Sequence, residues 1–335
     1  MRILVLGGTV FLGRAVARQA VAAGHDVTCA ARGSSGEPVD GVQFVRVDRD
    51  EPDGLDGLDG EFDAMVDVAR RPSHVRHAVG ALAGRVGHVT FVSTGSVYRD
   101  ISTPGQRVET APIMEPAPPD FDDPAQDPDA YGRCKVTCEQ LVADAFGEAN
   151  VFTCRPGLIV GPEDPSGRFD YWVRRAARGG EILVPGTPDD PVQLIDVRDV
   201  ADWIIAAAAD GLTGTYDALA PPITRQAFMD ALVDDSSTTT YVPQEFLLEH
   251  EVAPWSGPRS LPLWLPLPEY AGFMSRDVTP SLEVGLRPRP LAETARDTAA
   301  ARRDDTPTIG LTGAEETEIL ETWHARERRG QRQWR

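Results

Sequence analysis

Lysine is almost absent from this protein. Lysine and arginine together number 33 among the 335 residues, and Lys135 is the single lysine. Because arginine supplies positive charge elsewhere, the position that keeps lysine is expected to need a compact ammonium. Lys135 stands four residues after Tyr131, and residues at this spacing share one face of a helix. Such an ammonium would lower the pKa of the Tyr131 phenol and favour acid/base catalysis at a hydroxyl group, although an ordinary amphipathic helix explains the pair equally well.

Long apolar runs and an excess of basic residues are also missing. No stretch approaches the roughly twenty apolar residues of a membrane span, and the N-terminal apolar run is too short for a signal peptide. The net charge of −19 opposes binding to nucleic acids or anionic membranes. Four cysteines without a repeating pattern suit a reducing cytoplasm. Cys134 and Cys138 predict helix packing rather than a metal site, because no His or Asp pattern completes such a site.

The N-terminal segment has the pattern of a dinucleotide-binding unit. The apolar run Met1–Leu6 predicts a buried strand, a helical pattern follows the glycine turn, and 27–31 predicts a second strand. Glycines in such a turn let the backbone approach a pyrophosphate at the helix N-terminus, so a nucleotide site is favoured over a plain tight turn. The predicted cofactor residues of the turn are Gly7, Gly8, Thr9, Val10, Phe11, Leu12 and Gly13.

Alternating strands and helices continue through the first lobe. Strand-like runs occur at 42–47, 62–68 and 88–92, and 76–83 is helical in character. This alternation predicts an α/β fold, a Rossmann-type doubly wound parallel sheet that binds ligands at the carboxyl ends of its strands. The predicted cofactor residues at these strand ends are Asp48, Arg49, Val68 and Ala69.

These elements resemble the short-chain dehydrogenase/reductase superfamily, in its extended, NAD-dependent epimerase/dehydratase-like branch. The turn resembles an atypical subgroup of that branch with the pattern Gly-Gly-Thr-x-Phe. The five matching motifs occur in the family's order over roughly residues 1 to 220, and they are 7–13, 93–98, 131–135, 155–162 and 193–201.

The resemblance implies a role for each matching residue. Tyr131 would donate and accept the proton, and Lys135 would lower its pKa and hold the nicotinamide ribose. Thr94 would donate a hydrogen bond to the reacting oxygen. The nicotinamide would be bordered by Pro156, Gly157 and Leu158.

Three positions depart from the family pattern. Val10 replaces the middle glycine of the turn, which puts the pyrophosphate geometry in doubt. Arg32 stands where NAD-selective members carry an acid, so it would pair with a 2′-phosphate and favour NADP over NAD; a solvent-facing arginine is the alternative. Arg49 would share that phosphate. Arg99 follows Tyr98, where a glycine is common, at the rim of the substrate cleft.

The remaining half of the chain is expected to bind and recognise the substrate. We predict a Rossmann domain over 1–165 and a smaller C-terminal α/β substrate lobe over 166–335, with 193–220 returning to the first domain. Ser96, Arg99 and Arg168 are the predicted substrate residues. The acidic, proline-rich stretch 109–129 predicts a surface loop, either solvated or acting as a lid, and 312–315 has a capping-box pattern before a C-terminal helix.

Together these features predict a cytoplasmic NAD(P)-dependent oxidoreductase that interconverts a secondary alcohol and a ketone. The substrate would be small and polar, either a nucleotide sugar that is epimerised or dehydrated or a natural product that is reduced. We also consider a homodimer through the Tyr131 helix. The alternative is a catalytically silent NAD(P)-binding sensor or RNA-binding protein of the atypical subgroup, which acidity and the intact Thr94, Tyr131 and Lys135 set disfavour.

Overall fold

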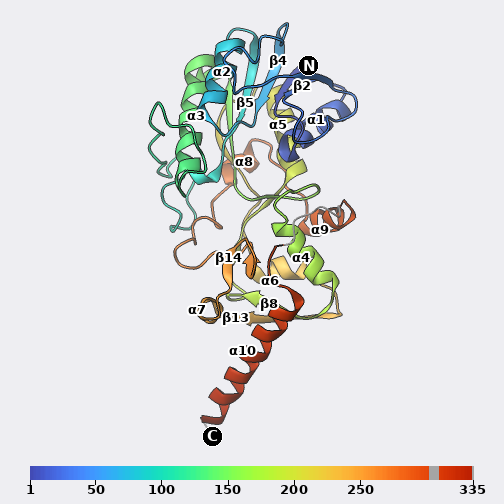
Figure 1. Cartoon of the computed structure of the whole chain (residues 1–335), viewed down its shortest axis with the longest axis vertical. Coiled ribbons are helices and arrows are strands. Elements are labelled where there is room, and N and C mark those ends of the chain that lie inside the picture. Colours follow the sequence, from blue (N-terminus) through green and yellow to red (C-terminus); the bar gives the residue numbers. More distant parts are fainter. Residues whose placement is uncertain (302–308, 334–335) are drawn as a thin grey trace. The chain divides into compact units, whose positions relative to one another are not determined.

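The computed structural model describes residues 1–301 and 309–333 of the chain (Figure 1). It divides into two compact units, which are described separately. Unit 1 consists of Met1–Ile159, Leu194–Pro221 and Arg276–Pro288, and unit 2 consists of Val160–Gln193, Pro222–Ser275 and Arg289–Arg335.

Unit 1 contains a seven-stranded parallel sheet, as the alternating pattern predicts. The strand order is β11-β6-β5-β4-β1-β2-β3, so the order reverses beside β1. Strands buried on both faces are expected to be continuously apolar, and β1 shows this because Ile3, Leu4, Val5 and Leu6 are all buried. The strands are β1 (Arg2–Leu6), β2 (Asp26–Ala31), β3 (Gln43–Arg46), β4 (Phe62–Asp67), β5 (Val86–Val92), β6 (Val151–Pro156) and β11 (Gly214–Ala218).

Helices cover both faces of this sheet (Figure 1). Apolar side chains of α1 (Phe11–Ala22) and α5 (Val197–Asp210) share one core with the sheet, and those of α2 (Pro72–Leu82) and α3 (Ala130–Phe146) share another. Trp203 on α5 packs edge-on against Phe152 of β6, with ring centroids 4.9 Å apart. The expected Rossmann-type fold is therefore confirmed, and the carboxyl ends of the strands form one edge of the sheet.

The segment Arg276–Pro288 also belongs to unit 1, although we expected it in the C-terminal lobe. Its short helix α8 (Thr279–Glu283) packs near β11, where the Ser281 hydroxyl donates to the carbonyl of Asp217 over 2.6 Å. Nε1 of Trp203 donates to the carbonyl of Val284 over 3.2 Å. These contacts join positions far apart in the sequence, which local patterning cannot reveal.

Unit 2 has its own aromatic core. Trp172 of α4 (Arg168–Ala177) is fully buried, packs against Phe228 and donates from Nε1 to the carbonyl of Pro262. Arg175 forms a buried ion pair with Glu316. The other elements are β8 (Gly180–Pro185), β9 (Pro191–Val192), β12 (Ile223–Thr224), α6 (Arg225–Asp230), β13 (Ser237–Val242), α7 (Gln244–Glu249), β14 (Ala253–Trp255), β15 (Ser260–Pro262), α9 (Leu291–Ala300) and α10 (Gly313–Gln333).

Four short elements complete the inventory of the described residues: β7 (Ile159–Val160), β10 (Ile195–Asp196), and the 3-10 turns η1 (Gly95–Val97) and η2 (Glu148–Asn150). The capping box before α10 is confirmed, because the backbone N–H of Thr312 donates to Glu315 and that of Glu315 donates to the Thr312 hydroxyl. The stretch 109–129 contains neither helix nor strand, as its composition predicts. Within the described ranges, no helix is both long and apolar enough to cross a membrane.

All four cysteines are buried and unpaired. Burial raises the pKa of Cys134 to about 11 and that of Cys138 to about 12, so both are neutral thiols at ordinary pH. Over residues 1–301 and 309–333, no group of three His, Cys, Asp or Glu side chains is arranged to hold a metal ion. The two cysteines of α3 lie on its buried face.

Candidate active site

The glycine turn brings the start of α1 against β1. Gly7 adopts a φ of +94°, which other residues rarely adopt. A Cβ on Gly13 would lie only 2.3 Å from the carbonyl oxygen of Gly7, and one on Gly8 would lie 2.5 Å from Sγ of Cys29. Val10 caps α1 without a side-chain hydrogen bond and is 41% exposed. These glycines therefore permit the close packing that opens the α1 N-terminus to a ligand.

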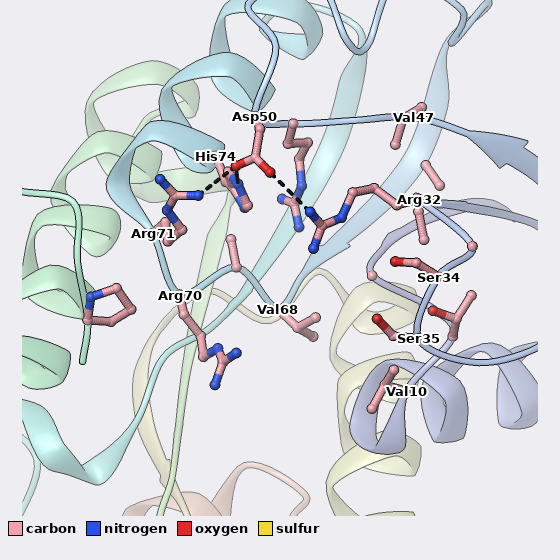
Figure 2. A pocket seen from close by; sticks show the side chains of 18 residues that line it. Val10, Arg32, Ser34, Ser35, Val47, Asp50, Val68, Arg70, Arg71 and His74 are labelled. Atoms are coloured by element: carbon pink, nitrogen blue, oxygen red, sulfur yellow. Dashed lines mark hydrogen bonds and ion pairs between the residues drawn. The ribbon is translucent and has the colours of Figure 1, made fainter.

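A cavity of about 310 Å³ lies beside this turn, at the carboxyl ends of β1, β2, β3 and β4 (Figure 2). Seven of the predicted cofactor residues line it, namely Gly7, Thr9, Val10, Arg32, Arg49, Val68 and Ala69. Other predicted cofactor residues are not among its lining, namely Gly8, Phe11, Leu12, Gly13, Asp48, Tyr131, Lys135, Pro156, Gly157 and Leu158. Sequence reasoning did not assign several that do line it, namely Ser34, Ser35, Asp50, Arg70, Arg71 and His74.

Three basic side chains converge on Asp50 in this cavity (Figure 2). Its carboxylate lies 3.0 Å from Nη1 of Arg32, 2.6 Å from Nη1 of Arg71 and 2.8 Å from Nε2 of His74. The hydrogen bond with His74, together with the charges of all three partners, holds the pKa of Asp50 below its usual range. Arg32 is thus paired with a carboxylate rather than facing solvent alone.

Arg49 pairs with a different carboxylate. Its Nη1 lies 2.7 Å from Oδ1 of Asp67, the last residue of β4, and both side chains are largely buried. The same Oδ1 accepts a hydrogen bond from the backbone N–H of Ala69. The Arg49 side chain is consequently fixed at the wall of the cavity, and its backbone carbonyl oxygen accepts a hydrogen bond from Nδ1 of His77 over 2.8 Å.

Lys135 is fully buried on α3, one turn after Tyr131. Its ammonium donates a 2.6 Å hydrogen bond to the carbonyl of Ala69 and a second, short one to the carbonyl of Val92. It also lies 4.5 Å from the centroid of the Phe91 ring. Burial lowers the pKa of Lys135 to about 8, because the charged form loses its hydration. An ammonium has three donors, and these two carbonyls use two of them.

Tyr131 has a raised pKa, which corrects the lowered value expected from its neighbouring lysine. Burial of the phenol is the largest influence and raises the pKa. A hydrogen bond with Thr94 and the charge of Arg70 oppose this effect. Arg70, which the sequence reasoning missed, is exposed and points away from Asp50 in Figure 2. The cation that acts most on the phenol is therefore Arg70 rather than Lys135.

Thr94 lies at the start of η1, directly after β5. Its Oγ1 accepts a hydrogen bond from the backbone N–H of Ser96 over 3.1 Å, and lies 3.3 Å from the Ser96 hydroxyl. A Cβ added to Gly95 would lie 3.6 Å from the Cα of Gly157, so the 156–158 segment passes beside this turn. Thr94, Ser96 and Tyr131 are thus brought together at the carboxyl end of β5.

The other two predicted substrate residues, Arg99 and Arg168, have contacts of their own. Arg99 is exposed, and its backbone N–H donates to the carbonyl of Pro112 in the acidic loop. Arg168 begins α4 in unit 2, where its guanidinium lies 4.4 Å from the centroid of the Trp255 ring and its Nε lies 3.2 Å from Oγ of Ser166. The contacts of Arg168 are therefore within its own unit.

A buried network of charges lies beneath η1. The Tyr98 hydroxyl donates to Asp217 over 2.6 Å, and Nε of Arg276 donates to the same carboxylate over 2.8 Å. Arg155 donates to the Tyr98 hydroxyl over 3.3 Å and pairs with Glu139 of α3. The Arg276 guanidinium also lies 3.4 Å from the Tyr98 ring centroid. This network ties η1 to β11 and to the returning segment 276–288.

The sequence from residue 3 to residue 217 matches the family model described as the NAD dependent epimerase/dehydratase family. This chain belongs to that family. Membership makes it an NAD(P)-dependent enzyme of the extended short-chain dehydrogenase/reductase type. The matched range covers the glycine turn, Thr94, Tyr131, Lys135 and Asp217.

Individual proteins and solved structures are also similar to this chain. A dTDP-6-deoxy-L-talose 4-dehydrogenase (NAD(P)(+)) of Kitasatospora kifunensis is 26% identical over 275 residues, which cover 72% of this chain and 81% of that protein. The crystal structure of UDP-N-acetylglucosamine 4-epimerase from Bacillus cereus superposes with a TM-score of 0.63 at 15% identity, covering 90% of this chain and all of that one. UDP-glucuronic acid 4-epimerase from Bacillus cereus, in complex with NAD, gives a TM-score of 0.62 at 14% identity, covering 90% of this chain and 98% of that one.

The residues of unit 1 fit the adenosine and phosphate end of NAD. The cavity extends from the α1 N-terminus, which would stabilise a pyrophosphate, to the ends of β2 and β3. A Cβ on Gly8 or Gly13 would clash with Cys29 or with the Gly7 carbonyl, so the turn needs glycine at both positions. Arginines also line this cavity, namely Arg32, Arg49, Arg70 and Arg71. They add positive charge there, although the net charge of the protein is −19.

Proposed function

We propose that this enzyme interconverts a secondary alcohol and a ketone on a small polar substrate. The observation that supports it best is the grouping of Thr94 and Tyr131 at the end of β5, one helical turn from Lys135. Lys135 reaches back to Ala69, a residue that lines the cofactor cavity. Acid/base and cofactor groups therefore meet at one edge of the sheet.

The nicotinamide, when bound, supplies or accepts the hydride. In the oxidative direction the ionised Tyr131 oxygen would accept the proton of the substrate hydroxyl as the carbon–hydrogen bond of the same carbon breaks, and the C–O bond would become a carbonyl. The Thr94 hydroxyl would donate a hydrogen bond to the reacting oxygen of the substrate. Lys135 would hold the ribose hydroxyls through its third donor, since the carbonyls of Ala69 and Val92 occupy the other two. The reductive direction reverses each proton movement.

The net reaction depends on what happens to the ketone. If the ketone is reduced again from its other face before release, the outcome is epimerisation; if it is released, the outcome is oxidation or reduction. The named activities of the relatives favour a nucleotide sugar as substrate, with reduction of a natural product as the second candidate. For the cofactor, Arg32 favours NADP over NAD. We also propose that the enzyme forms a homodimer through α3.

One experiment tests this function directly. Purified protein is mixed with NAD or NADP and with nucleoside-diphosphate sugars or simpler secondary alcohols, and absorbance is followed in the reduced-nicotinamide band. Substrate-dependent formation of reduced cofactor supports the proposal. Oxidised cofactor that stays bound through purification indicates epimerisation, and free exchange indicates a reductase. Failure of both cofactors to bind would contradict the assignment.

A further inference from the structure

The cluster around Asp50 has the composition of a phosphate site, yet its centre is a carboxylate. Arg32 follows β2, Asp50 follows β3, and Arg71 and His74 come from the start of α2. Figure 2 shows the three basic side chains directed at Asp50, and all four residues line the cofactor cavity. Two guanidiniums and an imidazole around one anion are the partners that proteins commonly use for a phosphate group.

The partners differ in how firmly they are held. Arg71 is also anchored to Asp122 of the acidic loop over 2.8 Å, and Asp122 accepts hydrogen bonds from the backbone and hydroxyl of Ser73. Arg71 would therefore stay in place if Asp50 moved. The side chains of Arg32 and Asp50 are 54% and 36% exposed, so their ion pair can separate at little cost.

We propose that Asp50 is a specificity-determining residue, an internal anion that occupies the position where Arg32, Arg71 and His74 would bind the 2′-phosphate of NADP. A 2′-phosphate must displace this carboxylate or bind beside it, and both cost free energy. A ribose with a free 2′-hydroxyl meets no such competition. Asp50 thus weakens the NADP preference that Arg32 alone would confer. The inference rests on the cofactor site of the proposed function and adds Arg71 and His74 to it.

The test uses the full chain and two adenosine fragments that differ in the 2′-phosphate. Titration calorimetry measures binding of adenosine 2′,5′-bisphosphate and adenosine 5′-monophosphate to the parent, to Asp50→Asn and to Asp56→Asn. Asp56 is an exposed aspartate on the same loop, so its variant controls for the change in net charge. Asp50→Asn should bind the bisphosphate about tenfold more tightly and the monophosphate within about twofold of the parent. Asp56→Asn should resemble the parent for both.

A second variant shows whether the gain acts through the cluster. In Asp50→Asn/Arg71→Met the gain for the bisphosphate should disappear, because the fixed guanidinium is gone. An equal gain in Asp56→Asn, or no gain in Asp50→Asn, would overturn the inference while leaving the cofactor site intact. A loss of monophosphate affinity in Asp50→Asn would also overturn it, since Asp50 would then accept the ribose 2′-hydroxyl. If neither fragment and neither dinucleotide binds the parent, the proposed function fails, and this inference fails with it.

Discussion

Nζ of Lys135 donates a 2.6 Å hydrogen bond to the carbonyl oxygen of Ala69, and this contact joins α3 to the cavity beside the glycine turn. The ammonium also donates to the carbonyl of Val92, so the one lysine of the chain is held at the carboxyl ends of β4 and β5. A guanidinium in its place would be too wide for a fully buried position between two backbone carbonyls. The geometry therefore explains why arginine does not substitute for lysine here.

Tyr131→Phe tests the proton transfer. The variant keeps the ring but loses the hydroxyl that exchanges the proton, so turnover should fall on the order of a hundredfold or more. Cofactor affinity should change little. Steady-state rates and cofactor titration measure the two quantities separately. A variant that turns over at the parent rate would show that another group moves the proton.

Lys135→Met tests the burial of the ammonium through the pH dependence of stability. The pKa of Lys135 is lowered from 10.5 to about 8, so between these values the unfolded chain holds a proton that the folded chain has lost. The free energy of unfolding of the parent, relative to the variant, should therefore rise as pH increases through this window and be flat below it. Urea unfolding of both proteins across the window measures the difference. A constant difference would show that the pKa of the lysine is not lowered in the folded protein.

Arg70→Leu tests the cation that acts on Tyr131. Because Arg70 lowers the pKa of the phenol, its removal should raise that pKa and move the tyrosine-dependent limb of the kcat/KM profile to higher pH. Arg2→Leu removes the same charge from the amino end of β1, at the opposite edge of the sheet, and should leave the profile in place. Lost activity without a displaced profile would instead mean that Arg70 only binds the cofactor.

Arg276→Met tests the network beneath η1. It leaves the buried carboxylate of Asp217 without its cation, and breaking a buried pair in this way costs about 3–5 kcal/mol of unfolding free energy. The double variant Arg276→Met/Asp217→Asn should cost less than the two single variants added together, because no unpaired charge remains. Denaturant unfolding of the four proteins gives the coupling. Additive losses would indicate that the two side chains act independently.

How much the sequence predicts depends on the separation of the residues involved. The glycine turn, β1 and the Tyr131–Lys135 spacing are local patterns, so the sequence alone reveals them and predicts a site at the strand ends. The Asp50 cluster joins α2 to β2 and β3, and the Tyr98–Asp217 bond joins residues 119 positions apart. Such pairs depend on side-chain directions across folded segments. Arg70 was missed for the same reason, since an arginine after a strand carries no local signal.

Arg32→Ala tests cofactor choice. A guanidinium–phosphate contact is strong and directional, so its loss should weaken NADPH binding about tenfold or more and leave NADH nearly unchanged. The loss should shrink at high salt, because Arg32 is about half exposed and its charge is screened.

The effect of Arg32→Ala on NADPH affinity is expected to differ between the parent and the Asp50→Asn variant. In the parent, Nη1 of Arg32 lies 3.0 Å from the Asp50 carboxylate. This ion pair competes with a phosphate for the guanidinium, so Arg32 binds the phosphate less strongly. In Asp50→Asn that competition is absent, and Arg32→Ala should then cost more NADPH affinity than it does in the parent. Calorimetric titration of NADPH and NADH is carried out on the parent, Arg32→Ala, Asp50→Asn and the double variant. It measures how much affinity Arg32→Ala costs in each background. Equal losses for the two cofactors in both backgrounds would refute NADP selection by Arg32, and they would leave the fold and the role of Tyr131 untouched.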